Sequence, residues 1–156
     1  MAKVLKVRAC KKTKRNAIRK YKALVHYYNT HSKMLDIVKE MLERNMWTRQ
    51  ESMEHSETIG ALEQLAECSL YVELELLQAR DVIRSLLDEV KREKDEGAIL
   101  LNPMDYIRIA EMVELEFYLN ELKNEAGNIL HEVLEVLDKI RIYGLILPLI
   151  CTIIKV

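Results

Sequence analysis

Glycine and proline are scarce in this sequence, with four and two residues among 156. Because both residues interrupt helices, few breaks are available, and the residues that favour long helices, such as Leu, Glu, Lys and Ala, dominate instead. Hydrophobic residues make up 49% of the chain, so it can bury a core of its own. These features predict an all-α fold in one domain, and the length excludes only a multidomain machine.

Cysteine is also sparse, and its placement argues against two classes of small fold. The three cysteines lie far apart, with no C-x-x-C spacing and no even pairing. The spacing therefore indicates neither a disulfide framework nor a zinc knuckle, and a reducing compartment is favoured. The N-terminus has basic residues but no apolar stretch of about 7–15 residues behind them, so no secretory signal is predicted. We expect a cytoplasmic protein.

Catalytic motifs are missing as well. The sequence has no Gly-rich phosphate loop, no G-x-S-x-G and no H-E-x-x-H, and its four histidines are scattered. Glu51, Glu54 and His55 come nearest to a set of metal ligands, but we interpret them as a solvated first helical turn. The sequence therefore predicts no enzyme: it offers no catalytic residue, no metal site and no cofactor.

The strongest feature present is helical periodicity. Apolar residues recur at spacings of three and four from about 14 to 46 and again from about 48 to 96. Thr48 followed by Glu51 has the spacing of a capping box, and Gly97 can cap the end of the second segment. The pattern predicts a long helical hairpin, about 14–46 and 48–96.

A further helix start follows the hairpin. Asn102 can cap it, Pro103 lacks only an N–H that a helix start does not need, and Asp105 suits the positive helix end. Gly127 offers a joint within the apolar pattern that follows. We therefore predict one bent helix or two helices over about 103–141.

The two ends of the chain differ in character from this helical part. Residues 1–13 form a basic N-terminal arm, whose conformation the mixed pattern leaves open. Residues 142–156 form an apolar C-terminal tail, too short to span a bilayer, which takes about 20 residues. We therefore divide the chain into 1–13, 14–141 and 142–156.

Charge is strongly segregated, although the net charge is only −1. Residues 1–24 hold ten Lys and Arg and no acid, so they carry +10, and the remainder, with fourteen bases and twenty-five acids, carries −11. Such a basic segment suits a membrane, a nucleic acid, or an acidic part of its own or a neighbouring chain. The predicted membrane- or nucleic-acid-binding residues are Lys3, Lys6, Arg8, Lys11, Lys12, Lys14, Arg15, Arg19 and Lys20.

Each of three aromatic residues has two possible roles. Tyr21 and Tyr28 could stack nucleic-acid bases, but they follow the apolar stripe of the first helix, which favours packing in the core. Trp47 stands at the predicted turn, where a large apolar side chain is either a local staple or a contact with another chain.

Part of the second helical segment resembles a known family. Residues 54–57 (EHSE), leading into residues 71–80 (YVELELLQAR), resemble ESCRT-III proteins, and the archaeal CdvB-like branch is the nearest likeness. The resemblance covers about residues 14–140 and includes the basic first helix, the hairpin and the later acidic helices. It implies subunits that polymerise on membranes and bend or cut them during cell division or budding. It also implies a cytoplasmic protein held peripherally on an anionic membrane.

The resemblance also implies which residues meet other subunits, and where this chain departs from the family. The partners would be copies of itself or related subunits. The predicted polymer or partner contacts are Trp47, Leu62, Leu65, Val72, Leu76, Ile83 and Leu86. No Pro-rich linker, winged-helix segment or ATPase-recruiting helix follows residue 140, so recruitment of the disassembly ATPase is not expected.

Two other functions fit the same sequence. A helical coat or nucleoprotein subunit would wrap nucleic acid with its basic arm, and its binding would weaken steeply with salt. A helical-bundle adaptor would instead use the apolar seam of the second helix for a partner's helix. The sequence leaves all three functions open.

Overall fold

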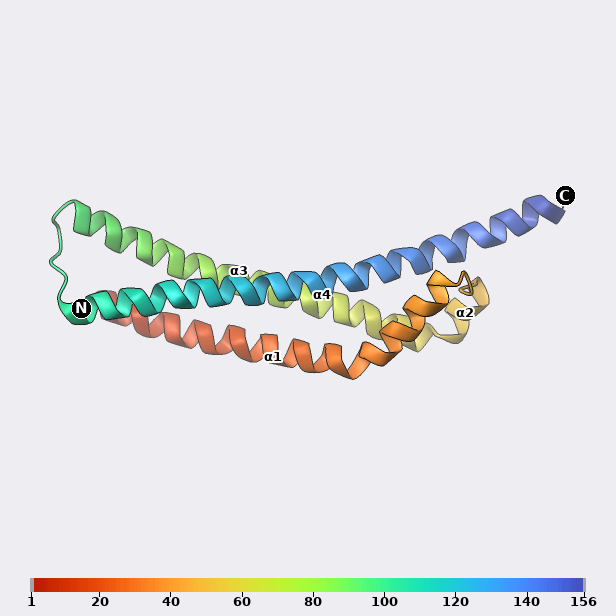
Figure 1. Cartoon of the computed structure of the whole chain (residues 1–156), viewed down its shortest axis with the longest axis horizontal. Helices are drawn as coiled ribbons and strands as arrows, with labels where there is room; N and C mark the ends of the chain where they lie inside the picture. The colour runs from red at the N-terminus through yellow and green to blue at the C-terminus, as the bar shows by residue number, and fades with distance from the viewer. Residues whose placement is uncertain (1, 156) are drawn as a thin grey trace. The chain divides into compact units, whose positions relative to one another are not determined.

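The computed structural model consists of helices (Figure 1). It describes the backbone of residues 2–155 and the side chains of residues 14–143. Within these residues no strand occurs, which confirms the predicted all-α fold. The helices are α1 (Ala2–Glu43), α2 (Arg49–Glu54), α3 (Ser56–Asp95) and α4 (Pro103–Lys155).

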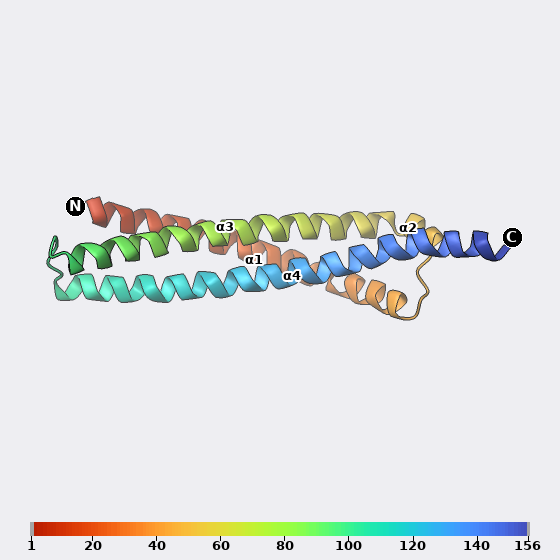
Figure 2. The same cartoon turned by 90° about the horizontal axis from the view of Figure 1, so that it is seen from above.

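The chain forms two compact units, each built from stretches of the same three long helices. Unit 1 comprises Met1–Lys22 and Tyr71–Ala126, and unit 2 comprises Ala23–Leu70 and Gly127–Val156. In unit 1, α3 and α4 lie side by side and are joined by a short loop, and the start of α1 lies at the same end as that loop (Figures 1 and 2). Each unit has a buried apolar interior of its own.

The interior of unit 1 combines small and branched side chains. Polar pairs flank it: Arg80 donates to Asn120 at 2.6 Å, and Arg84 pairs with Glu116 at 2.7 Å. The three buried alanines allow close approach of the helices, since interaxial distance depends on the side chains at the contact. The buried apolar residues are Ala17, Val72, Leu76, Ala79, Ile83, Met112, Leu119, Leu122 and Ala126.

The interior of unit 2 contains larger side chains and one buried polar residue. Ser69 satisfies its hydroxyl by donating to the Leu65 carbonyl at 2.6 Å, so its burial leaves no unpaired polar group. At the edge, the Tyr143 hydroxyl donates to Asn45 at 3.1 Å. The buried apolar residues are Leu24, Leu35, Val38, Leu42, Trp47, Leu62, Leu65, Ala66, Val133, Val136, Leu137 and Ile140.

The predicted turn after the first helix is present, and its geometry explains where α1 ends. Asn45 adopts φ 54°, and the N–H of Met46 donates to the Met41 carbonyl at 2.9 Å. These are features of a Schellman motif, in which a residue in the left-handed region closes the helix. Thr48 then caps α2 by accepting from the N–H of Glu51 at 3.2 Å, which confirms the predicted capping residue.

The second helix differs from the prediction, because the single helix expected over about 48–96 is broken. α2 ends at Glu54, His55 has φ −109° and ψ 31°, and α3 begins at Ser56. The apolar stripe of this segment starts only further along the chain, and α2 contains no buried residue. No side chain of α2 therefore continues the buried apolar face of α3. Without that packing, the helix axis can change direction between α2 and α3.

α4 begins as predicted and runs further than predicted. The N–H of Asp105 donates to Asn102 at 2.9 Å and the N–H of Asn102 donates to Asp105 at 3.0 Å, a reciprocal cap. Of the two alternatives, one helix or two, the structure has one, because α4 continues through Gly127 to Lys155. Among the described residues, no helix is both long and apolar enough to cross a membrane.

Candidate functional site

The basic residues predicted to bind an anionic surface lie on α1. The side chains of Lys3, Lys6, Arg8, Lys11 and Lys12 fall outside the described residues, although the helix itself begins at Ala2. The side chains of the remaining four, Lys14, Arg15, Arg19 and Lys20, are described: Lys14 is half-buried, and the other three fall into two groups.

Arg15 and Arg19 form a basic face together with Lys22. All three side chains are exposed, and their spacing of four and then three residues places them on one side of α1. Ala17 and Leu24 are buried, and helical geometry puts them on the opposite side. We call Arg15, Arg19 and Lys22 the basic face.

Lys20 is engaged within unit 1 instead. Its ammonium pairs with Glu75 and lies 5.3 Å from the centre of the Tyr71 ring. An ion pair already compensates its charge, so this lysine is a weaker candidate for an external anion than Arg15 or Arg19. Sequence position alone could not separate these residues, because the distinction depends on a partner 55 residues away.

The predicted partner contacts are mostly inside the chain. Trp47, Leu62, Leu65, Val72, Leu76 and Ile83 are at most 5% exposed, and Leu86 is half-buried. In this conformation α1 and α4 supply the apolar partners that a neighbouring subunit would otherwise supply. Contact with another subunit through these residues would require the helices to separate, and it stays a prediction.

Trp47 is a local staple in this structure. Its side chain is fully buried, its indole N–H donates to Ser52 at 2.7 Å, and its ring lies 5.8 Å from the His55 ring. A buried indole with a satisfied N–H stabilises the turn between α1 and α2. Of the two interpretations of this residue, the structure supports the local one.

Tyr21 and Tyr28 bridge α1 to α4. Burial and a hydrogen bond to Glu125 raise the pKa of Tyr21 to about 12, and burial and a hydrogen bond to Glu132 do the same for the pKa of Tyr28. Both hydroxyls are thus committed to carboxylates in the same chain. This supports packing over base stacking as the role of the two tyrosines.

Glu132 is the acceptor of two such bridges. It accepts from Tyr28 at 2.8 Å and pairs with Lys39. Burial opposes ionisation of this carboxyl, but the hydrogen bonds from Lys39 and Tyr28 outweigh it and hold its pKa below the usual value. These groups act as a structural bridge between two helices of unit 2.

Glu51, Glu54 and His55 remain the nearest approach to a metal site among the described residues. Their potential ligand atoms lie within 4.8 Å of one another, and His55 Nε2 is 3.1 Å from a Glu51 oxygen. Gln50 already donates to Glu54 at 3.0 Å, and His55 and Glu54 are exposed. These contacts fit the solvated turn that the sequence predicts.

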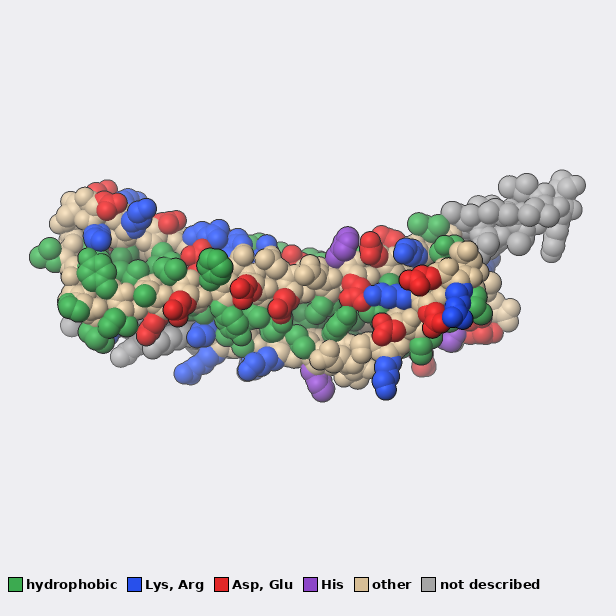
Figure 3. Space-filling view, viewed as in Figure 1, with side chains coloured by type: hydrophobic (Ala, Val, Ile, Leu, Met, Phe, Trp, Pro, Cys, Tyr) green, Lys and Arg blue, Asp and Glu red, His purple; other side chains and the backbone are tan. Residues whose placement is uncertain are grey.

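Sequence reasoning missed an exposed apolar surface on the first half of α4. Phe117, the single phenylalanine, is 71% exposed, and large apolar neighbours on α4 are also exposed. Figure 3 shows hydrophobic side chains gathered on unit 1 with acidic ones among them. The apolar residues of this stretch exceed what one buried face of a helix can hold, and an apolar pattern in sequence does not show which of them a neighbouring helix covers. The exposed residues are Met104, Tyr106, Ile107, Val113, Phe117 and Tyr118.

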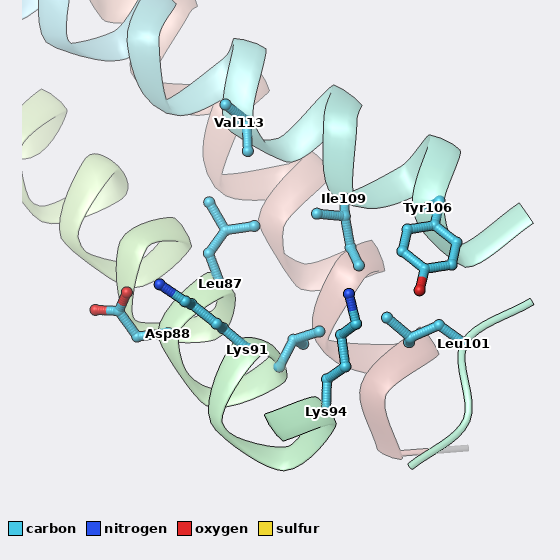
Figure 4. A pocket seen from close by; sticks show the side chains of 9 residues that line it. Leu87, Asp88, Lys91, Lys94, Leu101, Tyr106, Ile109 and Val113 are labelled. Carbon is cyan, nitrogen blue, oxygen red and sulfur yellow. The ribbon is translucent and has the colours of Figure 1, made fainter. Parts of the chain in front are cut away.

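A groove of about 270 Å³ lies between the end of α3 and the start of α4, within unit 1. Figure 4 shows Leu87 and Lys91 on α3, Tyr106 and Ile109 on α4, and Leu101 on the connecting loop, with Lys94 beside the tyrosine. The Lys94 ammonium is 5.1 Å from the centre of the Tyr106 ring. A mainly apolar groove with charged residues at its rim offers packing and charge to a ligand or partner.

The arrangement therefore supports binding, through a basic face on α1 and an apolar surface on α4 and its preceding loop. A scan against protein-family models, a search of curated proteins and a search of solved structures each found no match.

Proposed function

We propose that this protein is a non-enzymatic helical subunit of ESCRT-III type, which binds anionic membranes peripherally and assembles there with copies of itself to remodel them. The observation that carries the proposal is the exposed basic face of Arg15, Arg19 and Lys22, within a 24-residue segment of charge +10. Basic residues near an anionic leaflet each contribute about 1 kcal/mol. Three such residues contribute about 3 kcal/mol before any other residue of the segment is counted.

Assembly with other copies is supported by complementary surfaces. The exposed part of α4 carries Phe117 and Tyr118 together with the acidic Glu114 and Glu121. Residues outside the basic segment carry −11. This acidic, partly apolar face of α4 suits basic side chains of a neighbouring subunit other than Arg15, Arg19 and Lys22, which we assign to the membrane, and such a contact does not need the buried seam.

A nucleic-acid coat is the competing function, because the same basic face would neutralise phosphates. The half-buried Tyr21 and Tyr28 do not favour it, since both hydroxyls are bound to glutamates. A stacking platform needs free ring faces beside the basic groove. We therefore place the membrane ahead of nucleic acid and make the latter an outcome of the test.

Vesicle flotation and negative-stain electron microscopy test this proposal. The triple variant Arg15→Glu, Arg19→Glu, Lys22→Glu should lose binding to vesicles of phosphatidylserine and phosphatidylcholine. A matched control, Lys33→Glu, Lys139→Glu, Arg141→Glu, changes the charge equally at exposed positions in unit 2 and should retain it. Circular dichroism should report equal helicity for both.

Each outcome has a defined meaning. Filaments or coated tubules on vesicles, lost only in the basic-face variant, would support the proposal. Ordered rods formed only with duplex DNA would replace it with the coat function. Dispersed particles under every condition would refute both functions and favour the third, a helical-bundle adaptor.

A further inference from the structure

The loop between α3 and α4 is unusually apolar for a helical hairpin. Residues 98–101 read Ala-Ile-Leu-Leu, where polar turn residues are the rule. Leu100 is 98% exposed, the highest exposure of any large hydrophobic residue among the described side chains. Its isobutyl group therefore contributes nothing to the core of this chain.

Both ends of the loop are held by hydrogen bonds. At the end of α3, Gly97 has φ 70°, its N–H donates to the Lys94 carbonyl at 3.0 Å, and the N–H of Ala98 donates to the Glu93 carbonyl at 2.9 Å. This is a Schellman motif. At the other end lies the reciprocal cap between Asn102 and Asp105. The loop is fixed on both sides, so little conformational entropy remains to be lost when it meets a partner.

The two leucines of the loop differ: Leu101 packs into the groove, and Leu100 points into solvent. Leu101 lines the groove between α3 and α4, beside Tyr106 and Ile109 (Figure 4). On the first turns of α4, Met104 and Ile107 are 57% and 53% exposed and lie three residues apart, so they share one helix face. Leu100, Met104 and Ile107 are thus three exposed apolar side chains within eight residues at the loop end of unit 1. We call Leu100, Met104 and Ile107 the apolar tip.

Charge at this end of unit 1 indicates what the tip meets. The start of α1 lies at the same end as the loop (Figures 1 and 2), and residues 1–24 carry +10. A partner that suits both features must be anionic at its surface and apolar beneath it. An anionic bilayer has this profile, whereas a nucleic-acid backbone satisfies the charge alone.

We propose that the apolar tip inserts into the interface of an anionic membrane while the basic segment of α1 contacts the headgroups. This inference rests on the proposed membrane function and names the element that enters the lipid. Insertion of aliphatic side chains adds to electrostatic attraction, which alone is screened by salt. Binding should therefore keep a salt-resistant component that depends on Leu100.

The test compares two substitutions with the same chemical change. Leu100→Glu places a charge at the tip, and Ile37→Glu places it at a 59% exposed position of α1 in unit 2. Neither side chain is in the core, so both variants should fold. We expect Leu100→Glu to bind vesicles of phosphatidylserine and phosphatidylcholine at least about tenfold more weakly than wild type, and Ile37→Glu to bind unchanged.

A second measurement detects insertion directly. In Leu100→Trp, the new indole should shift its fluorescence to the blue on adding the same vesicles, because it leaves water. Ile37→Trp should not shift, and the buried Trp47 gives the same background in both. A blue shift with duplex DNA and none with vesicles would overturn the lipid assignment.

The two proposals fail in distinguishable ways. If Leu100→Glu binds like wild type while the basic-face variant does not, the tip inference is wrong and the membrane function stands. If the wild-type protein binds no vesicles, both are wrong. Loss of binding by Leu100→Glu and Ile37→Glu alike would also overturn the inference, because added negative charge alone would then explain the effect.

Discussion

The side chains with the most distinctive contacts in this protein join one helix to another. Trp47 looked from the sequence like either a staple or a contact with another chain, and its burial supports the staple. Tyr28 and Glu132 are 104 residues apart in sequence, so no local pattern could have paired them. The sequence identified these aromatic residues as candidates for packing, and only the structure showed which residues they contact.

Removal of the Trp47 side chain gives the first prediction at this scale. Trp47→Ala should lower the free energy of unfolding by about 3–5 kcal/mol, because a fully buried indole leaves a cavity. Ser52→Ala, which removes only the acceptor of the indole N–H, should cost about 1 kcal/mol. Urea titration followed by circular dichroism measures both. Wild-type stability of Trp47→Ala with lost self-association would instead make Trp47 a partner contact.

The Glu132 bridge predicts a pH dependence. The pKa of Glu132 is lower in the folded chain than its ordinary value of 4.5, so its stabilisation is present above that pH and is lost as the pH falls through the folded pKa. Glu132→Gln removes this dependence. The difference in urea midpoint between wild type and Glu132→Gln should shrink as the pH is lowered from 7 towards 3.

Tyr28 gives the opposite sign at alkaline pH. Its pKa is raised from 10.0 to about 12 in the folded chain, so the stabilisation is complete below pH 10 and is lost as the pH rises towards 12. Tyr28→Phe should be less sensitive than wild type over this range. An equal loss of stability in both proteins from pH 10 to 12 would contradict the assigned bridge.

At the scale of helices, the residues at which helices begin were easier to predict than whether a helix continues without a break. The caps at Thr48 and Asn102 depend on neighbours three residues away, so their signals are local and were read correctly. The break at His55 was missed because α2 has no buried residue, and periodicity reports only residues that pack. The apolar loop at 98–101 was missed because its sequence, Ala-Ile-Leu-Leu, lacks the polar residues that mark a turn.

Two glycines offer a matched prediction at this scale. Gly97 has φ 70°, and an added Cβ would meet nothing within 4 Å, so Gly97→Ala should cost about 1 kcal/mol through backbone strain alone. Gly60 lies inside α3 with equally open space, so Gly60→Ala should instead stabilise by about 0.8–1 kcal/mol. Urea midpoints of the two variants should move in opposite directions. Equal signs would contradict the left-handed conformation of Gly97.

At the scale of the whole molecule, segregation of charge is the property that bears on function. The chain is nearly neutral, yet its first 24 residues carry +10 and the rest −11. Such segregated charge creates an electrostatic field that affects association and surface binding. It does not determine the fold. The proposed function therefore depends on which of these charges remain exposed after folding. Lys20 is paired internally and Arg15 is exposed, a difference that net charge does not reveal.

The sequence by itself determined the helical class, the hairpin turn, both helix caps and the polarity of the chain. Each of these follows from residue composition or from spacings of three and four, which act within one helical turn. The tertiary structure decided which apolar residues are core and which are surface. Leu76 became buried and Phe117 exposed because burial depends on which helices meet, and those contacts join residues far apart in sequence.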